Sequence, residues 1–186
     1  MKKHLATPLF KAILLLFVLV TYSCKTPEPR KPISRTTSST TELSIENNKQ
    51  IYAAEEAAIE KVIAGLDQKF ERSTYGFYYS FTQKDSLKGK TPAFGDRVTF
   101  EYNVIALNGD TIYSKDELSP ITKSMEQEYG IFRGMRDALK LMQTGEEATF
   151  YFPSYTGYGY YGDQDRIGTN VPFKSDVKLL GINIEE

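Results

Sequence analysis

The alternation of apolar and polar residues is most informative in residues 130–162, where it predicts a helix, a turn, a strand and an aromatic loop in succession. Apolar side chains recur at steps of three, four and three, which puts an apolar face on the helix, at Phe132, Met135, Leu139 and Met142. Gly145 ends this helix, because glycine readily adopts the left-handed conformation that a helix end requires. Residues 146–152 then favour a strand, which stops at Pro153. A helix laid on a sheet and followed by an aromatic loop predicts a pocket.

Strand-forming runs lie on both sides of this region. Tyr75 to Phe81 predicts the first strand, Arg97 to Leu107 the longest strand and Val171 to Ile184 the last. The sequence Asn108-Gly109-Asp110 predicts a hairpin turn that leads into a short extended piece at residues 111–114. One helix placed between runs of strands predicts an α+β domain with a mostly antiparallel sheet.

An additional N-terminal helix is expected before these strands, from Asn47 or Asn48 to Leu66, within a segment that we assign to residues 47–72. Asparagine can cap the start of a helix, and the body is rich in alanine and glutamate. The helix carries an apolar stripe at Tyr52, Ile59, Ile63 and Leu66. This stripe favours a helix that packs on the domain that follows, assigned to residues 73–186, or that serves as a spacer. A helix that forms a dimer or docks a partner is the alternative.

The beginning of the chain is typical of an exported protein. A basic start, an apolar run at residues 12–20 that is too short to cross a bilayer, and a small residue before Cys24 predict a lipoprotein signal peptide over residues 1–23. Cys24 would then carry the lipid; an ordinary signal peptide with an incidental cysteine is the alternative. Residues 24–46 are rich in Pro, Ser, Thr, Lys and Arg and predict a disordered tether.

The residue types that remain after cleavage exclude several kinds of chemistry. His4 is the only histidine and Cys24 the only cysteine, so neither a Ser/His/Asp or Cys/His catalytic site nor a His/Cys metal site is expected in the mature chain. No cofactor or metal is therefore predicted. Losing the three lysines of residues 1–23 changes the formal net charge from −1 to −4, and no basic patch indicates binding to nucleic acid.

Several short blocks, in this order and at these spacings, carry a likeness to a known family: Gly95-Asp96, Val98, Tyr102, Asn108-Gly109-Asp110-Thr111, Ile131 to Met135, Ala138-Leu139, Met142, Gly145-Glu146, Tyr158-Gly159 and Asp176 to Leu180. Together they resemble the FKBP-type peptidyl-prolyl cis-trans isomerases, over Tyr75 to Ile184. The lipoprotein start and the YGYYG and IGTNVPFKSDVKLL segments resemble the gliding-motility-associated lipoprotein branch of that family. The resemblance implies a curled antiparallel sheet wrapped around one short helix, with an apolar ligand pocket between them.

The resemblance also implies which residues form the site. Three are expected to be catalytic: Tyr102, Phe132 and Tyr158. Five more are expected to bind substrate: Ile112, Tyr113, Ile131, Met135 and Ile167. Tyr113 stands where the family usually has an acid, Met135 where it has Trp, and Ser175 where it has Phe. Simple core packing is the alternative role for Tyr102, Met135 and Tyr158.

Prolyl isomerisation suits a chain without histidine, because it transfers no proton and breaks no covalent bond. The expected function is therefore that of a membrane-anchored isomerase assisting the folding of exported or cell-envelope proteins, including those of a gliding-motility apparatus. Its expected partners are proline-containing client polypeptides, motility-machinery proteins and, through the lipid, the outer membrane facing the periplasm. A non-catalytic, FKBP-like subunit that binds a peptide or a motility or secretion partner is the alternative, which the three substitutions and the membrane tether support.

Overall fold

The computed structural model describes residues 38–85, 89–118, 120–126 and 130–183. Residues 1–37, which include Cys24, the expected signal peptide and most of the expected tether, lie outside the described residues. The chain divides into two compact units, Met1–Ser39 and Thr40–Glu186, and the description below concerns the second unit and the start of its first helix. Among the helices of the described residues, none is long and apolar enough to span a membrane.

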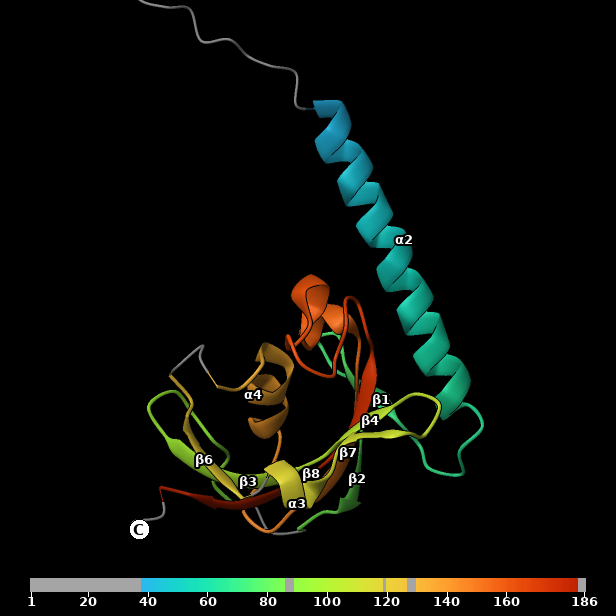
Figure 1. Ribbon diagram of the computed structural model, residues 1–186. Coiled ribbons are helices and arrows are strands. Elements are labelled where there is room, and N and C mark those ends of the chain that lie inside the picture. Colours follow the sequence, from blue (N-terminus) through green and yellow to red (C-terminus); the bar gives the residue numbers. More distant parts are fainter. Residues whose placement is uncertain (1–37, 86–88, 119, 127–129, 184–186) are drawn as a thin grey trace, which may run out of the picture. The chain divides into compact units, whose positions relative to one another are not determined.

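The second unit is built on one eight-stranded sheet in the order β1-β2-β7-β8-β3-β6, with β4 paired to β8 and β5 to β4 (Figure 1). The strands are β1 (Glu71–Arg72), β2 (Tyr78–Gln83), β3 (Arg97–Tyr102), β4 (Val104–Ala106), β5 (Thr111–Tyr113), β6 (Ile121–Ser124), β7 (Glu147–Phe152) and β8 (Phe173–Ile182). Every pairing is antiparallel, as the sequence predicts. The helices are α2 (Ser38–Ile63), α3 (Lys115–Leu118) and α4 (Arg133–Leu139), with single 3-10 turns η1 (Ser154–Thr156) and η2 (Gly159–Tyr161).

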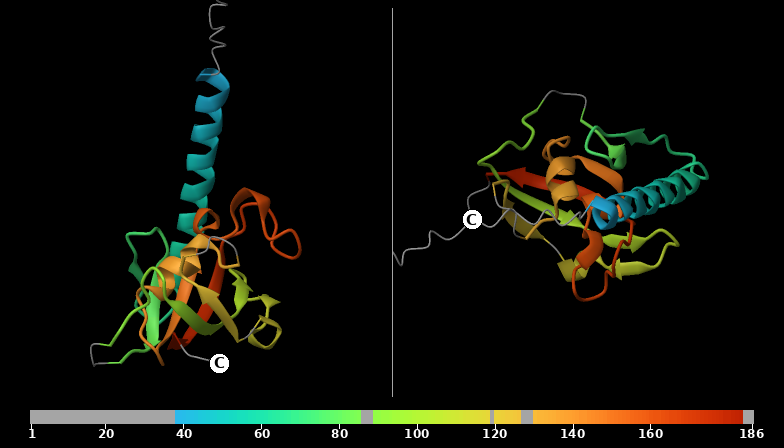
Figure 2. Two further views of the ribbon diagram at one scale, coloured as in Figure 1. Left: turned by 90° about the vertical axis from the view of Figure 1, so that its left-hand side faces the viewer. Right: turned by 90° about the horizontal axis from the view of Figure 1, so that it is seen from above.

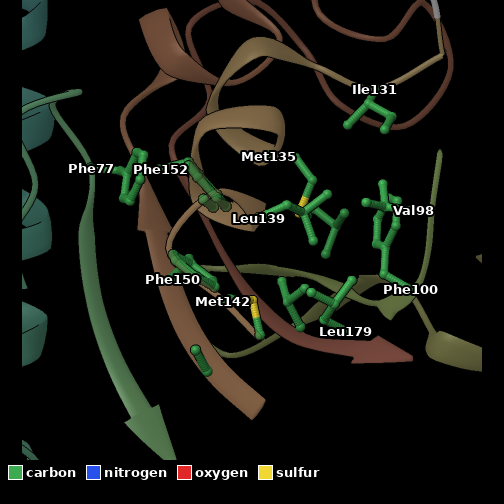
Figure 3. Close-up of a cluster of buried hydrophobic side chains, with 14 of the residues drawn as sticks. Phe77, Val98, Phe100, Ile131, Met135, Leu139, Met142, Phe150, Phe152 and Leu179 are labelled. Carbon is green, nitrogen blue, oxygen red and sulfur yellow. The ribbon is translucent and has the colours of Figure 1, made fainter. Parts of the chain in front are cut away.

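Helix α4 lies across the concave face of the sheet, whose strands curve around it (Figure 1). Its predicted apolar face is confirmed, since Met135, Leu139 and Met142 are fully buried. They meet Phe77, which directly precedes β2, and side chains of the sheet, among them Phe100, Phe150, Phe152 and Leu179 (Figure 3). The regular helix is shorter than the predicted span of residues 132–142, because the chain beyond Leu139 tightens into turns with bonds from Leu141 N–H to Ala138 O and from Met142 N–H to Leu139 O.

The predicted longest strand, Arg97 to Leu107, is broken in the structure. Asn103 separates β3 from β4, and its side chain pairs with Asp176 of β8 through bonds of 2.6 and 3.2 Å. Ser175 Oγ donates to the Asn103 carbonyl at 2.6 Å, so the break is held by polar contacts to β8. The longest strand is β8, with ten residues. The expected hairpin at residues 108–110 is confirmed, with Gly109 at a φ of 96°.

The first strand of the sheet also differs from the prediction. Residues 75 and 76 form a turn, in which Gly76 has a φ of 94° and donates to the Ser73 carbonyl. The aromatic run therefore enters the sheet only at Tyr78, as β2, and the two-residue strand β1 precedes it. A positive φ at glycine allows this turn inside a run of strand-forming residues.

The N-terminal helix begins earlier and ends earlier than predicted. Helix α2 starts at Ser38, so residues 38–46 are helical rather than part of a disordered tether, and neither Asn47 nor Asn48 is a cap. These nine positions contain no proline or glycine, so nothing in them blocks a helix. The helix ends at Ile63 and not at Leu66 or residue 72. Beyond it the chain forms a turn, in which the N–H groups of Gly65 and Leu66 each donate to the carbonyl three residues earlier in the chain.

The favoured role of the apolar stripe of α2 is confirmed, because the helix packs on the domain that follows it. Ile59 is fully buried in a cluster with Tyr78 and Tyr151, and Ile63 packs against the same cluster. Tyr52 contacts the ring of Tyr155 at 4.9 Å. The loop between β7 and β8 thus has α2 on one side and α4 on the other (Figure 2).

Candidate functional site

An aromatic cluster joins the start of α4 to the loop between β7 and β8. Phe132 immediately precedes α4, and its ring centroid lies 5.0 Å from that of Tyr158 in the loop and 5.4 Å from that of Phe173 on β8. The rings of Tyr158 and Phe173 are 5.7 Å apart. Phe132 and Tyr158 are half-buried, whereas Phe173 is fully buried. The first two rings therefore offer apolar surface while the third supports them from the core.

Tyr102 places a second phenol at this cluster. It ends β3, lies half-buried beside Phe100 with ring centroids 5.6 Å apart, and its hydroxyl interacts with that of Tyr158. Burial, Tyr102 and the carboxylate of Asp163 raise the pKa of Tyr158 far above its ordinary value. Burial also raises the pKa of Tyr102, with Asp163 acting in the same direction and Tyr158 opposing it. Both groups therefore stay protonated near neutrality and can donate a hydrogen bond to a carbonyl oxygen.

The eight predicted site residues divide by exposure. Five are half-buried and have surface left for a ligand: Tyr102, Ile112, Tyr113, Phe132 and Tyr158. Three are buried: Ile131, Met135 and Ile167. The side chain of Met135 has no exposed surface and points among the core residues (Figure 3), so it supports the site from beneath. This placement agrees with the core-packing alternative for Met135.

A polar edge at β5 adds residues that the sequence analysis missed. Tyr113 Oη donates to Asp163 Oδ2 at 2.5 Å and also lies 3.2 Å from Asp165 Oδ2. Arg166 lies over the Tyr113 ring at 4.7 Å and donates to the Ile112 carbonyl at 2.9 Å. Burial and the bond to Asp163 raise the pKa of Tyr113 to about 12. The only sequence signal for Asp163 was its place directly after a glycine in the aromatic loop.

The aromatic loop is also held from α2, which the sequence analysis did not foresee. Glu55 is buried and accepts two hydrogen bonds from Ser154, one from the main-chain N–H and one from Oγ, both at 2.7 Å. The hydroxyl oxygen of Tyr155 lies 2.6 Å from a carboxylate oxygen of Glu56 and 3.0 Å from the Gly76 carbonyl oxygen, within hydrogen-bond distance of both. Acidic residues at successive positions of a helix gave no hint of partners about a hundred residues away.

The described residues contain no group of three His, Cys, Asp or Glu side chains placed to hold a metal ion. The site consists of aromatic rings, phenolic hydroxyls and the carboxylates of Asp163 and Asp165. Such a surface can enclose an apolar ring and donate hydrogen bonds to the carbonyl groups that flank it.

Comparison with known proteins supports the same identification. The family model for FKBP-type peptidyl-prolyl cis-trans isomerases matches residues 88–180. A curated protein of Neisseria meningitidis, described as the probable FKBP-type peptidyl-prolyl cis-trans isomerase FkpA, is 35% identical over 113 residues, which make up 60% of this chain and 39% of that protein. The chain thus spans about two fifths of the length of this curated relative.

Two solved structures are similar in fold. A peptidyl-prolyl cis-trans isomerase of Pseudomonas syringae pv. tomato superposes with a TM-score of 0.58 at 19% identity, covering 72% of this chain and 94% of that one. FkpA of Escherichia coli superposes with the same TM-score of 0.58 at 21% identity, covering 92% of this chain and 81% of that one. These similarities confirm the predicted α+β fold with its sheet around one short helix and its additional N-terminal helix.

Proposed function

The chain belongs to the FKBP-type peptidyl-prolyl cis-trans isomerase family, and we propose that it catalyses cis-trans isomerisation of the peptide bond that precedes proline. The observation that carries this proposal is the pair of half-buried rings of Phe132 and Tyr158 beside a phenolic hydroxyl that stays protonated. An apolar proline ring would lie against these aromatic faces. The Tyr158 hydroxyl would donate to a carbonyl next to the isomerising bond.

The barrier of this reaction is rotation about a C–N bond with partial double-bond character, about 18–20 kcal/mol. The rotated amide loses its resonance and is less polar than either planar form, so an apolar surface favours it over bulk water. Only contacts that are stronger in the twisted state speed the reaction. Phe132 caps α4, so the helix does not need its main-chain N–H, which can bind a second substrate carbonyl.

Tyr158→Phe tests the role of the hydroxyl, because it keeps the ring packing with Phe132 and Phe173. One hydrogen bond contributes about 0.5–1.5 kcal/mol, so we expect kcat/KM for a short Xaa-Pro peptide to fall roughly two- to tenfold in a protease-coupled assay. Unfolding free energy should change much less. Tyr160→Phe is the matched control, since Tyr160 is 69% exposed two residues away in the same loop.

Two results would contradict the proposal in different ways. Equal losses of turnover and stability in Tyr158→Phe would make Tyr158 a structural residue. Wild-type activity at background level, together with intact binding of the proline peptide, would favour the non-catalytic binding subunit instead.

We also propose that the protein acts in the bacterial cell envelope, lipidated at Cys24 and bound to the outer membrane facing the periplasm, on proline-containing exported proteins. The basic start, the short apolar run at residues 12–20 and the position of Cys24 support this location. Radiolabelled palmitate should enter the wild-type protein and not Cys24→Ser, and fractionation should show the variant leaving the membrane. A link to gliding motility, with motility proteins as clients or partners, is proposed from the resemblance to that branch, and loss of spreading in a deletion strain would test it.

A further inference from the structure

Asp163 lies at the centre of the polar edge of the site. It follows Gly162 in the loop between β7 and β8 and is half-buried. Its carboxylate accepts hydrogen bonds from two residues already placed at the site, the hydroxyl of Tyr113 on β5 and the main-chain N–H of Ile167, at 2.5 and 2.8 Å. A third bond comes from the N–H of Asp165 at 3.0 Å. The Asp163 side chain therefore makes hydrogen bonds both within the loop and to the neighbouring strand β5.

The bonds within the loop close a tight turn. While Asp163 Oδ1 accepts from two N–H groups of the turn, its own N–H donates to the Ile167 carbonyl at 3.1 Å. Gly162 has a φ of 64°, and a Cβ there would lie 2.0 Å from the same carbonyl oxygen, so only glycine permits this approach. The turn between residues 162 and 167 is thus fixed in shape.

The bond to Tyr113 fixes this turn to β5. The Tyr113 hydroxyl donates to Asp163 and accepts from the N–H of Arg166 at 3.4 Å, while the Arg166 guanidinium covers its ring. Arg166 also pairs with Glu117 of α3 at 2.9 Å. The hydroxyl of Tyr113 is therefore engaged on the protein side, which leaves its ring, and not its hydroxyl, for a substrate.

The carboxylate also acts on the phenols of the site. Its negative charge is among the causes that raise the pKa values of Tyr102 and Tyr158, after burial. The hydrogen bonds from Tyr113, Asp165 and Ile167 outweigh its own partial burial and lower the pKa of Asp163, so it is ionised at neutral pH. An ionised carboxylate in this place disfavours phenolate formation nearby and helps keep both phenols as donors.

We propose that Asp163 is a positioning residue of the isomerase site: through the Tyr113 hydroxyl it clamps the 162–167 turn to β5 and so holds Tyr158, earlier in the same loop, in its working place. This inference rests on the proposed function and adds to it a residue outside the predicted set. Tyr113 is then an anchor for the loop as well as part of the wall of the site.

Asp163→Asn is the sharpest perturbation. The amide oxygen can still accept from the N–H groups of the turn, and the amide nitrogen can only donate to the Tyr113 hydroxyl, so the turn survives while the charge-assisted bond becomes a weaker neutral bond of reversed direction. Three further variants complete the set: Tyr113→Phe, the double variant and the control Asp116→Asn. The control removes one exposed carboxylate on α3, three residues along the chain from Tyr113. Each is assayed for kcat/KM on one Xaa-Pro peptide and for unfolding free energy. The pKa of Tyr113 is measured by NMR with ring-labelled tyrosine in the wild type, Asp163→Asn and Asp116→Asn.

We expect Asp163→Asn to lower kcat/KM roughly threefold, because a neutral hydrogen bond replaces a charge-assisted one, with Asp116→Asn unchanged. Tyr113→Phe removes the bond altogether and should lower kcat/KM about tenfold, and the double variant should lose nothing beyond Tyr113→Phe, because both changes act through the same bond. The pKa of Tyr113 should fall in Asp163→Asn. If Asp163 had only a structural role, its replacement would lower the unfolding free energy, but the kcat/KM losses of the two single variants would not be non-additive in the double variant.

Three results would overturn the inference. They are wild-type kcat/KM in Asp163→Asn, losses that multiply in the double variant, and an unchanged pKa of Tyr113. If the wild-type protein itself does not accelerate isomerisation, the proposed function fails, and the inference is then decided by the Tyr113 titration and by the affinity of the same four variants for the peptide.

Discussion

Replacing Glu55 by alanine should loosen the contact between α2 and the aromatic loop. Glu55 is 7% exposed and Ser154 is fully buried, and the two bonds between them, both 2.7 Å long, join segments 99 residues apart. Ser154 lies four residues before Tyr158, so this contact supports the loop that carries the site. Alanine leaves the Ser154 N–H and hydroxyl without their acceptors in a place that water reaches poorly.

The size of the effect follows from two opposing contributions. Each buried donor left unsatisfied costs about 1–3 kcal/mol, which gives about 2–6 kcal/mol for the two groups. Against this, burial raises the pKa of Glu55, which means that the ionised carboxylate is itself less stable here than in water. We therefore expect Glu55→Ala to lower the unfolding free energy at neutral pH by about 1–4 kcal/mol.

Glu55→Gln separates the two contributions. Its amide oxygen can accept from the Ser154 N–H, and its amide nitrogen can donate to Ser154 Oγ, so both contacts persist without a buried charge. Its stability at neutral pH should lie within about 1 kcal/mol of the wild type, or above it. Because the pKa of Glu55 is higher in the folded protein than in the unfolded chain, the protonated side chain favours the folded state. This stabilisation is fully present at a pH below the unfolded-state pKa and is lost as the pH rises through the folded-state pKa. The glutamine variant should lack this pH dependence of stability.

Urea denaturation of the purified protein, followed by circular dichroism at several pH values, measures these differences. Glu42→Ala is the matched control, since Glu42 is exposed on the same helix and its loss should change stability by less than about 0.5 kcal/mol. An unchanged unfolding free energy in Glu55→Ala would refute the argument, and so would equal losses in the alanine and glutamine variants.

Two further predictions concern packing and alkaline stability. Gly134→Ala in α4 should destabilise the protein by about 1–3 kcal/mol, against the usual gain of about 1 kcal/mol for this change in a helix, because the new Cβ would lie 2.6 Å from the Thr156 carbonyl and 2.8 Å from the Phe152 ring. Thermal denaturation measures the sign, and a stabilised variant would contradict the packing argument. Burial and Glu60 raise the pKa of Tyr78 to about 12, so the folded protein holds this proton more tightly than the unfolded chain. Stability should therefore be intact below pH ~10 and decline as pH rises from ~10 to ~12, and Tyr78→Phe, by urea denaturation, should reduce that decline.

Local patterns predicted the parts of the fold in which neighbouring residues decide the outcome. The buried face of α4 and the hairpin at residues 108–110 follow from spacing and turn chemistry, and the structure confirms both. The break at Asn103 could not be predicted in the same way, because its cause is Asp176 on β8, far along the chain. The early start of α2 was missed because serine and threonine residues are weak signals for either helix or tether.

The candidate site shows the same division. The residues Tyr102, Phe132 and Tyr158 came from a family likeness carried by motifs, and the structure brings their rings and hydroxyls together. Which predicted site residues are half-buried and which are buried, as Met135 is, depended on how the sheet closes around α4.

The sequence by itself limited the chemistry that the side chains offer and predicted the main elements: no histidine after residue 4, one cysteine, and an apolar helix face between strands. Only the tertiary structure decided what holds the aromatic loop in place. Glu55 reaches it from α2, and Asp163 ties it to β5 through Tyr113. The physical reason is that apolar periodicity reports burial within one element, whereas a carboxylate is stabilised by whichever donors the fold places around it. The region that showed the clearest pattern, residues 130–162, therefore contains the site but not all of its supports.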